Sequence, residues 1–334
     1  MNISYPKYYE EFVCIAGKCP DSCCKEWCVD VDETSAAFYR NLSGPLGDRL
    51  RQVLRDTESG TVMTIENGQC PMWQQDGLCR IQAELGHDAL CKTCREYPRL
   101  RHDYDDFTEL GLELSCPEAA RLILTCNYQE WVTKTTFDNK TPEYDREAMD
   151  MLRRSRKGFL DFLDTTALPF PQILAILLLY AYDVQEELDG GSPAVLSPEY
   201  YLKEAYQFAN NAELRAFFTF FQNLEILTSK WKMKLQSPLK TPIWGTGNKA
   251  LLRYFINRYW LQTIADYDIV CRAKFAVAAC ILIGYLGGDF IETAQLFSKE
   301  IENDPDNMEA IFNGAYQDFA LTDLNLFGIL LKQN

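Results

Sequence analysis

The residues of this sequence best suited to chemistry are its thirteen cysteines, eleven of which fall within the first 126 residues. Five of them lie in the fifteen residues from Cys14 to Cys28. Thiolates bind zinc and iron–sulfur clusters, thiols form disulfides, and a free cysteine also packs well as a small apolar side chain. The cluster is therefore open to three interpretations: a disulfide framework, a metal or iron–sulfur site, and ordinary buried thiols.

The amino terminus bears on the choice between disulfides and metal. The stretch from Met1 to Phe12 has neither a basic start leading into an apolar run nor a small-residue cleavage site, so it does not read as a secretion signal. We therefore expect a cytoplasmic protein with reduced thiols. Clustered cysteines in that compartment bind metal more often than they form bridges, which favours a metal or cluster over disulfides and over plain packing.

The spacing of the cysteines bears on which metal they hold. Zinc ribbons and fingers present two separated Cys-x-x-Cys or Cys/His pairs, whereas here only Cys91 and Cys94 have that spacing, and His87 and His102 are the only histidines. An iron–sulfur cluster held by four thiolates from dispersed segments fits better. Zinc remains the alternative, because either metal accepts thiolates.

Proline follows three of the cysteines and suggests how helices position them. After Cys19-Pro20 the residues up to about Trp27 are compatible with a helix, which would place Cys19 at its N-cap. The same dipeptide recurs at Cys70-Pro71 and at Cys116-Pro117, where the residues after Pro117 again predict a helix start.

Short strands are expected between these cysteines. Thr61 to Glu66 is β-branched and is followed by Asn67-Gly68, and Asp76-Gly77 precedes Cys79, so Cys70 and Cys79 are predicted to flank a hairpin-like loop. Phe107 to Ser115 alternates apolar and polar residues, as a half-buried strand does. The cysteine-rich part is therefore predicted to be a small mixed α and β module.

Composition places limits on the possible partners. The 334 residues are 47% hydrophobic and carry a net charge of -15, which predicts a soluble folded protein and argues against nucleic acid or an anionic membrane as a partner. The longest apolar stretches, Ile173 to Ala181 and Phe275 to Ile283, are too short to span a bilayer and are expected to be buried helices.

The remainder of the chain predicts helices from about Tyr144, with breaks at proline and glycine positions. Phe290 to Tyr316 predicts a helical hairpin that turns at Asp304-Pro305 and resembles a single tetratricopeptide unit. We therefore expect a mainly α fold with two domains: a cysteine-rich iron–sulfur module at 1–140, of α+β type, and an α-helical bundle domain at 141–334.

The motifs of residues 5–125 resemble those of the flagellin lysine-N-methylase family, and are also similar to those of broader cysteine-cluster proteins that chelate zinc or iron. The matching residues are Phe12-x-Cys14, Cys19-Pro-Asp-Ser-Cys23-Cys24, Trp27, Cys70-Pro71, Gly77-Leu78-Cys79-x-Ile81, Cys94-x-x-Tyr97-Pro98-Arg99 and Ser115-Cys116-Pro117-Glu118-Ala119. The resemblance implies transfer of methyl groups from S-adenosylmethionine to surface lysines of flagellin, by an enzyme that contains a [4Fe-4S] cluster. This sequence departs from the family pattern at two places: Glu26 replaces the usual glycine before the tryptophan, and Met72-Trp73 replaces the usual Phe-Leu.

The resemblance also selects candidate site residues. The cysteines that match, and are expected to include the metal ligands, are Cys14, Cys19, Cys23, Cys24, Cys70, Cys79, Cys94 and Cys116. Cys19, Cys23, Cys79 and Cys94 are the first candidates for the thiolates around one cluster, while Cys28, Cys91 and Cys126 match nothing and are interpreted as packed thiols.

Cofactor and catalytic groups are chosen because they lie beside matched cysteines. Arg99 is the candidate for binding S-adenosylmethionine. The catalytic candidates are Asp30, Asp32, Tyr39 and Tyr97, for which solvated acids and packed tyrosines are the simpler interpretation.

Standard cofactor motifs give no further help. Trp244 to Asn248 contains two glycines but follows no predicted strand, and the radical-type C-x3-C-x2-C spacing fails at Glu26. The alternative to an enzyme is a non-catalytic iron–sulfur or zinc metalloprotein, either a redox or metal sensor or a flagellin-binding module.

Overall fold

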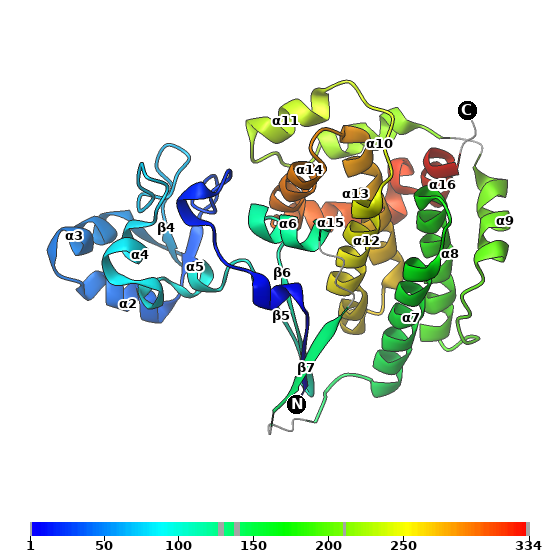
Figure 1. The fold of residues 1–334 in the computed structure, drawn as a ribbon, viewed down its shortest axis with the longest axis horizontal. Coiled ribbons are helices and arrows are strands. Elements are labelled where there is room, and N and C mark those ends of the chain that lie inside the picture. Colours follow the sequence, from blue (N-terminus) through cyan, green and yellow to red (C-terminus); the bar gives the residue numbers. More distant parts are fainter. Residues whose placement is uncertain (1, 126–129, 137–140, 210–211, 332–334) are drawn as a thin grey trace.

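The computed structural model describes residues 2–125, 130–136, 141–209 and 212–331. It is mainly helical, with a small α+β region near the amino terminus, as the sequence predicts (Figure 1). The strands are β1 (Asn2–Pro6), β2 (Val29–Val31), β3 (Leu54–Thr57), β4 (Gly60–Met63), β5 (Arg99–Tyr104), β6 (Phe107–Leu112) and β7 (Trp131–Thr135).

The longest helices lie in the second part of the chain. The first part contains α1 (Tyr8–Glu11), α2 (Glu33–Asn41), α3 (Gly44–Val53), α4 (Arg80–Leu85), α5 (Lys92–Glu96) and α6 (Pro117–Thr125). The second part contains α7 (Arg146–Thr165), α8 (Phe170–Leu188), α9 (Pro198–Phe208), α10 (Leu214–Gln222), α11 (Ser229–Gln236), α12 (Thr246–Tyr259), α13 (Ile269–Leu286), α14 (Phe290–Phe297), α15 (Pro305–Gln317) and α16 (Asp323–Leu331).

A small module carries most of the cysteines. Its three-stranded sheet has the order β2-β4-β3, and α2, α3 and α4 pack with it around a core that includes Tyr39, Leu50 and Ile81. The turn signal at Asn67-Gly68 is confirmed: both residues have positive φ, and Glu66 and Gln69 pair across the turn. Local turn chemistry therefore fixes the loop that leads into Cys70.

A second sheet, of order β5-β6-β1-β7, lies between this module and the helices (Figure 1). The predicted strand at 107–115 is β6, but its alternation is not that of a half-buried strand, because Phe107, Thr108 and Glu109 are all buried. Glu109 is covered by α7, where Arg156 donates two hydrogen bonds to its carboxylate, at 2.5 and 2.8 Å. Glu109 and Arg156 thus form an ion pair at a position where the alternation of apolar and polar residues predicts an exposed side chain.

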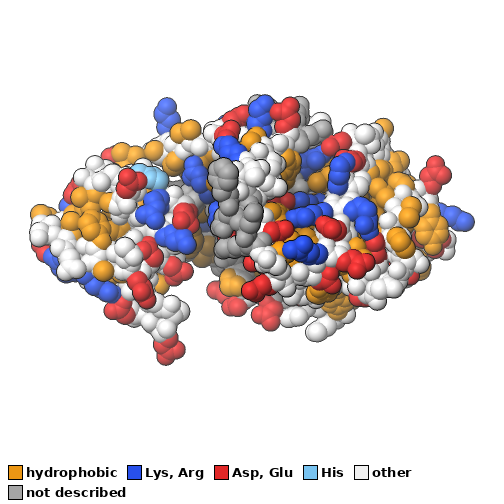
Figure 2. Space-filling model, turned by 90° about the horizontal axis from the view of Figure 1, so that it is seen from below, with side chains coloured by type: hydrophobic (Ala, Val, Ile, Leu, Met, Phe, Trp, Pro, Cys, Tyr) orange, Lys and Arg blue, Asp and Glu red, His pale blue; other side chains and the backbone are white. Residues whose placement is uncertain are grey.

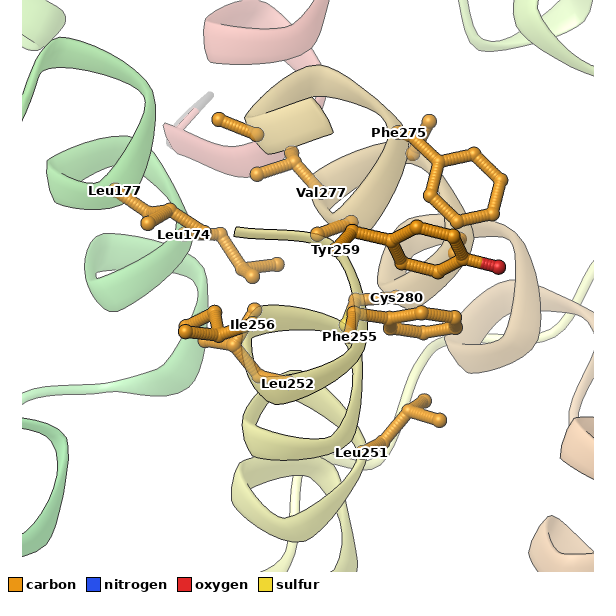
Figure 3. Close-up of a cluster of buried hydrophobic side chains, with 14 of the residues drawn as sticks. Leu174, Leu177, Leu251, Leu252, Phe255, Ile256, Tyr259, Phe275, Val277 and Cys280 are labelled. Carbon is orange, nitrogen blue, oxygen red and sulfur yellow. The ribbon is translucent and has the colours of Figure 1, made fainter. Parts of the chain in front are cut away.

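The helices enclose the main core. Leu252, Phe255 and Tyr259 of α12 pack against Phe275 and other residues of α13 and α8 (Figure 3). The helical prediction from about residue 144 is confirmed, and so are the two predicted buried helices, which are α8 and α13. The apolar stretch of α13 is longer than predicted: in the described part of the chain, this helix alone is long and apolar enough to cross a membrane, and 89% of it is buried inside the protein.

Helix α6 joins the cysteine-rich sequence to the helical body. It begins at Pro117, as predicted, and contacts α12 and α14, with Ala119, Ala120 and Leu122 buried in the main core. The domain boundary at residue 140 remains a prediction.

Basic and acidic side chains are interspersed over the face shown in Figure 2.

Candidate metal and cofactor site

Seven of the eight cysteines chosen from the sequence line one cavity of about 410 Å³. They come from four separate segments of the chain, and they are Cys14, Cys19, Cys23, Cys24, Cys79, Cys94 and Cys116. The eighth, Cys70, is buried; its thiol donates to the Met63 sulfur at 3.3 Å, and its amide donates to the Cys24 carbonyl at 2.7 Å. The fold therefore brings together thiols that lie up to about a hundred residues apart.

Two glycines allow the cysteine-bearing loops to meet. Gly77 has φ +79°, and a Cβ added to it would lie 3.0 Å from Cα of Gly17. A Cβ added to Gly17 would in turn lie 2.7 Å from the carbonyl oxygen of Asp76. The close approach of these two loops places the segment with Cys14 and Cys19 against Cys79, and it explains why glycine is needed at position 77.

The predicted hairpin-like loop between Cys70 and Cys79 is present. Trp73 and Cys79 pair as an antiparallel bridge, and Gly77 donates its backbone hydrogen to the carbonyl of Gln74 at 3.0 Å. Cys79 then precedes the first residue of α4. The Asp76-Gly77 turn signal thus led to the correct local structure.

The predicted helix from Cys19 to Trp27 is wrong. Cys19 instead follows a short 3-10 turn at Ala16–Lys18, and the residues after it are extended or in turns. The carbonyl of Cys24 accepts a hydrogen bond from the Cys70 amide at 2.7 Å, and the Glu26 amide donates to Gly68 at 2.9 Å. These non-local bonds take the place of helical ones, so the loop is held by the neighbouring turn.

Glu26 has a backbone conformation that favours glycine. Its φ is +72°, a conformation that glycine adopts without strain and other residues rarely adopt. The chain accepts glutamate there, and the Glu26 carboxylate forms an ion pair with Lys299 at 2.9 Å.

Hydrogen bonds between thiols perturb the acidity of the cysteines. Bonds from the thiols of Cys23 and Cys70 lower the pKa of Cys24 to about 3, and the same bonds, with burial, raise the pKa values of Cys23 and Cys70. Similarly, a bond from Cys94 lowers the pKa of Cys91 to about 7 and raises that of Cys94. In each of these groups one thiol loses its proton more readily at the expense of its neighbours.

The seven thiols line the wall of the cavity and are not gathered around one metal position. Among the residues that the structure describes, no group of three or more His, Cys, Asp or Glu side chains is arranged to hold a single metal ion. Thiols are the donors that an iron–sulfur cluster takes, so the donor set of this cavity fits the predicted cluster, and zinc accepts the same donors.

Two of the five cofactor and catalytic candidates line the cavity, namely Tyr97 and Arg99. The Arg99 guanidinium lies 5.1 Å from the centre of the Phe12 ring. The Tyr97 hydroxyl lies 3.1 Å from the Ser115 hydroxyl, and burial raises the pKa of Tyr97 well above its usual value.

The other three candidates do not line the cavity. Asp32 accepts hydrogen bonds from the amides of Ser35, at 3.0 Å, and Lys92, at 2.8 Å, and so caps α2. Tyr39 is fully buried in the small core and donates to a backbone carbonyl. Asp30 is an exposed residue of β2.

The unmatched cysteines lie in different surroundings. Cys91 is buried, as its interpretation as a packed thiol predicts, whereas Cys28 is exposed, so that interpretation is wrong for Cys28. Cys126 lies outside the described residues.

Sequence reasoning missed the helical residues that close the site. Gln295 donates to the Asp21 carboxylate at 2.9 Å and to the Ser115 carbonyl at 2.7 Å. The ammonium of Lys299 contacts Asp21 at 3.1 Å. Lys299 lies in Ser298–Glu302, a π-helical segment that continues α14, and such widened turns are frequent at functional sites. Gln295 and Lys299 are spaced by four residues, but no local sequence signal relates them to Asp21.

Comparison with known proteins gives relatives for about a third of the chain. The flagellar biosynthetic protein FliU of Salmonella muenchen is 28% identical over 137 residues, which cover 37% of this chain and 78% of that protein. The lysine-N-methylases of Salmonella typhimurium and Salmonella choleraesuis are 29% and 28% identical over 131 and 137 residues. Each of these two matches covers 37% of this chain and 33% of the methylase, so the match spans about a third of the length of these relatives.

No family model matches the chain, and no solved structure matches it. The relatives confirm the predicted resemblance to the lysine-N-methylase family, and they support a methylase-family function at low identity.

Proposed function

We propose that this protein is a cytoplasmic protein-lysine N-methyltransferase that acts on surface lysines of flagellin, using S-adenosylmethionine and an iron–sulfur cluster. One observation carries the proposal: seven matched cysteines line a single cavity together with Arg99 and Tyr97. The names of the relatives, which refer to lysine methylation and to flagellar biosynthesis, support the choice of reaction and of a flagellar substrate.

The cysteines around the cavity are the residues that would hold a [4Fe-4S] cluster. Cys19, Cys23, Cys79 and Cys94 are the first candidates, and each comes from the wall of the same cavity. An iron left without a thiolate would supply a binding point for the amino and carboxylate groups of S-adenosylmethionine. Arg99 adds a guanidinium at this wall, suited to a carboxylate.

Methyl transfer sets two further tasks for the protein. The substrate lysine must present a neutral amine, because its nitrogen lone pair forms the new bond to the methyl carbon as the carbon–sulfur bond of the sulfonium breaks. An ordinary lysine has a pKa of about 10.4, so the enzyme must accept a proton from the ammonium. Tyr97, which lies beside Cys23 and hydrogen bonds to Ser115, is the group of this wall best placed to orient the acceptor.

The test is incubation of anaerobically purified protein with flagellin, a reductant and methyl-labelled S-adenosylmethionine, followed by mass spectrometry of the flagellin lysines. The proposal expects the labelled methyl group on lysine. Absence of label from every flagellin lysine, with protein that carries its full metal content, would contradict it.

A non-catalytic metalloprotein is the second candidate. The small module has a limited apolar core, into which Cys70 and Cys91 are built, and a structural metal would brace a module of this kind. Bound iron or zinc without methyl transfer, together with unfolding of the module when the metal is removed, would favour this candidate.

A further inference from the structure

A second cavity, of about 270 Å³, adjoins the cysteine-lined one. Four residues line both cavities and so form a common wall: Asp21, Ser22, Cys23 and Tyr97. The other side of the second cavity is built from the helical body, by the residues near Glu225 and by the segment from Lys299 to Asp304. A molecule in this cavity would therefore lie next to whatever the first cavity binds.

The charges around the second cavity are strongly unequal. One lysine and five acids line it, and they are Lys299, Asp21, Glu26, Glu225, Glu300 and Asp304. Lys299 is already paired with Asp21 and Glu26. The remaining excess of carboxyl groups favours a cation over an anion.

Two aromatic rings add a surface for a cation and its alkyl stem. The rings of Trp27 and Tyr97 lie 5.8 Å apart with an interplanar angle of 52°. The indole of Trp27 is fixed, since its N–H donates to the carbonyl of Cys23 at 2.6 Å. Aromatic faces attract ammonium groups and cover the methylene chain of lysine.

We propose that this second cavity receives the side chain of the acceptor lysine, so that its amine meets the common wall at Cys23 and Tyr97. The inference rests on the proposed function, which it extends by assigning a place to the substrate. The methyl donor then occupies the first cavity and the lysine the second.

The carboxyl groups of the second cavity differ in their other duties. Glu300 accepts hydrogen bonds from the amides of Leu227 and Thr228, at 2.8 and 2.9 Å, and Asp304 caps α15. Glu225 is exposed, and its main chain exchanges hydrogen bonds with Asn307. Glu225 is therefore the carboxyl group that can be changed without loss of these structural contacts.

The kinetic test uses Glu225→Gln and Glu225→Lys in the full-length, metal-loaded protein, with Glu309→Gln as the matched control. Glu309 is an exposed acid of α15. We expect the KM for flagellin to rise about two- to fivefold in Glu225→Gln, as for loss of one exposed ion pair, and further in Glu225→Lys. The kcat is expected to change little, and Glu309→Gln is expected to match the unaltered protein. An unchanged KM in Glu225→Lys would overturn the inference.

A binding test separates this inference from the proposed function, because it needs no methyl transfer. Cys28 is exposed and lines the second cavity, so its alkylation by N-ethylmaleimide can be followed by mass spectrometry. We expect Nα-acetyl-lysine amide, at high concentration, to slow this reaction in the unaltered protein, and Nα-acetyl-norleucine amide to leave it unchanged. Protection in a protein that transfers no methyl group would support the cavity and contradict the enzyme, whereas equal rates with both amides would contradict the cavity.

Discussion

Lys299 joins the loop that carries Cys19 to Cys28 to the helical body, so its replacement by methionine tests how the site is held. Its ammonium lies 3.1 Å from the Asp21 carboxylate and 2.9 Å from that of Glu26. The side chain of Lys299 is 10% exposed, and those of the two acids are 23% and 38% exposed. The substitution preserves the aliphatic stem and leaves both carboxylates without this cation.

The expected cost follows from that burial. Loss of one partner of a fully buried pair costs about 3–5 kcal/mol, and an exposed pair is worth about 0–1 kcal/mol. The partly buried carboxylates lie between these limits, and Gln295 continues to donate to Asp21. We therefore expect Lys299→Met to lower the free energy of unfolding by about 2 kcal/mol.

The assay is urea unfolding of metal-loaded protein, with Lys230→Met as the matched control. Lys230 pairs with Glu292 at 2.6 Å, but the two side chains are 53% and 43% exposed, so its loss is expected to cost less than about 1 kcal/mol. Equal effects of the two substitutions would refute the reasoning, because burial would then have no influence on the strength of the pair.

Three further predictions concern the turn, a cap and the core. Gly77→Ala is expected to destabilise the module by about 1–3 kcal/mol and to lower its metal content, because φ is +79° and the new Cβ would meet Gly17. Thermal unfolding and metal analysis check this prediction, and unchanged values would contradict it. Asp32→Ala is expected to cost about 1 kcal/mol at pH 7. Hydrogen bonding, chiefly from the Lys92 amide, lowers the pKa of Asp32 to about 2. The loss of stability in Asp32→Ala should therefore reach its full value above a pH of about 4 and fade as the pH falls towards 2. A loss that does not change with pH in urea titrations would contradict this prediction. Phe275→Ala, at a position 1% exposed, is expected to cost about 3–5 kcal/mol by the same assay, and a cost below about 1 kcal/mol would show that the core of α12 and α13 is packed differently.

Local signals in the sequence were sufficient for much of the fold. Asn67-Gly68 formed the expected turn because both positions need positive φ, and Pro117 began α6 because proline suits a first helical turn. The predicted helical hairpin at Asp304-Pro305 is also present, with the Asp304 side chain capping α15. In each case the decisive contacts lie within a few residues.

Non-local contacts account for the errors. The segment after Cys19 has residues compatible with a helix, but the backbone of Cys24 and Glu26 bonds to the turn near Gly68. Glu109 was expected to face solvent, and it is buried because α7 supplies Arg156 as its partner. Neither partner is recognisable from the local pattern.

The candidate site could be predicted from the sequence only in part, because some of its contacts are also non-local. Cysteine types and spacing predicted an iron–sulfur cluster held by thiolates from dispersed segments and left open whether there are one or two metal sites. The fold places seven of the thiols around one cavity. The contributions of Gln295 and Lys299 come from almost 280 residues away along the chain, and no alternation or turn signal relates them to Asp21. Helix α6 packs against α14, and Gln295 donates to the carbonyl of Ser115, just before α6.

The most direct test of the central claim is the iron and acid-labile sulfide content of protein purified without oxygen, measured with the absorption spectrum. The account predicts about four irons and four sulfides per chain, strongly reduced by Cys23→Ser and retained in Cys271→Ser, which alters a buried cysteine of α13. A folded protein with one zinc and no iron, or with iron unaffected by loss of the cavity thiols, would contradict it.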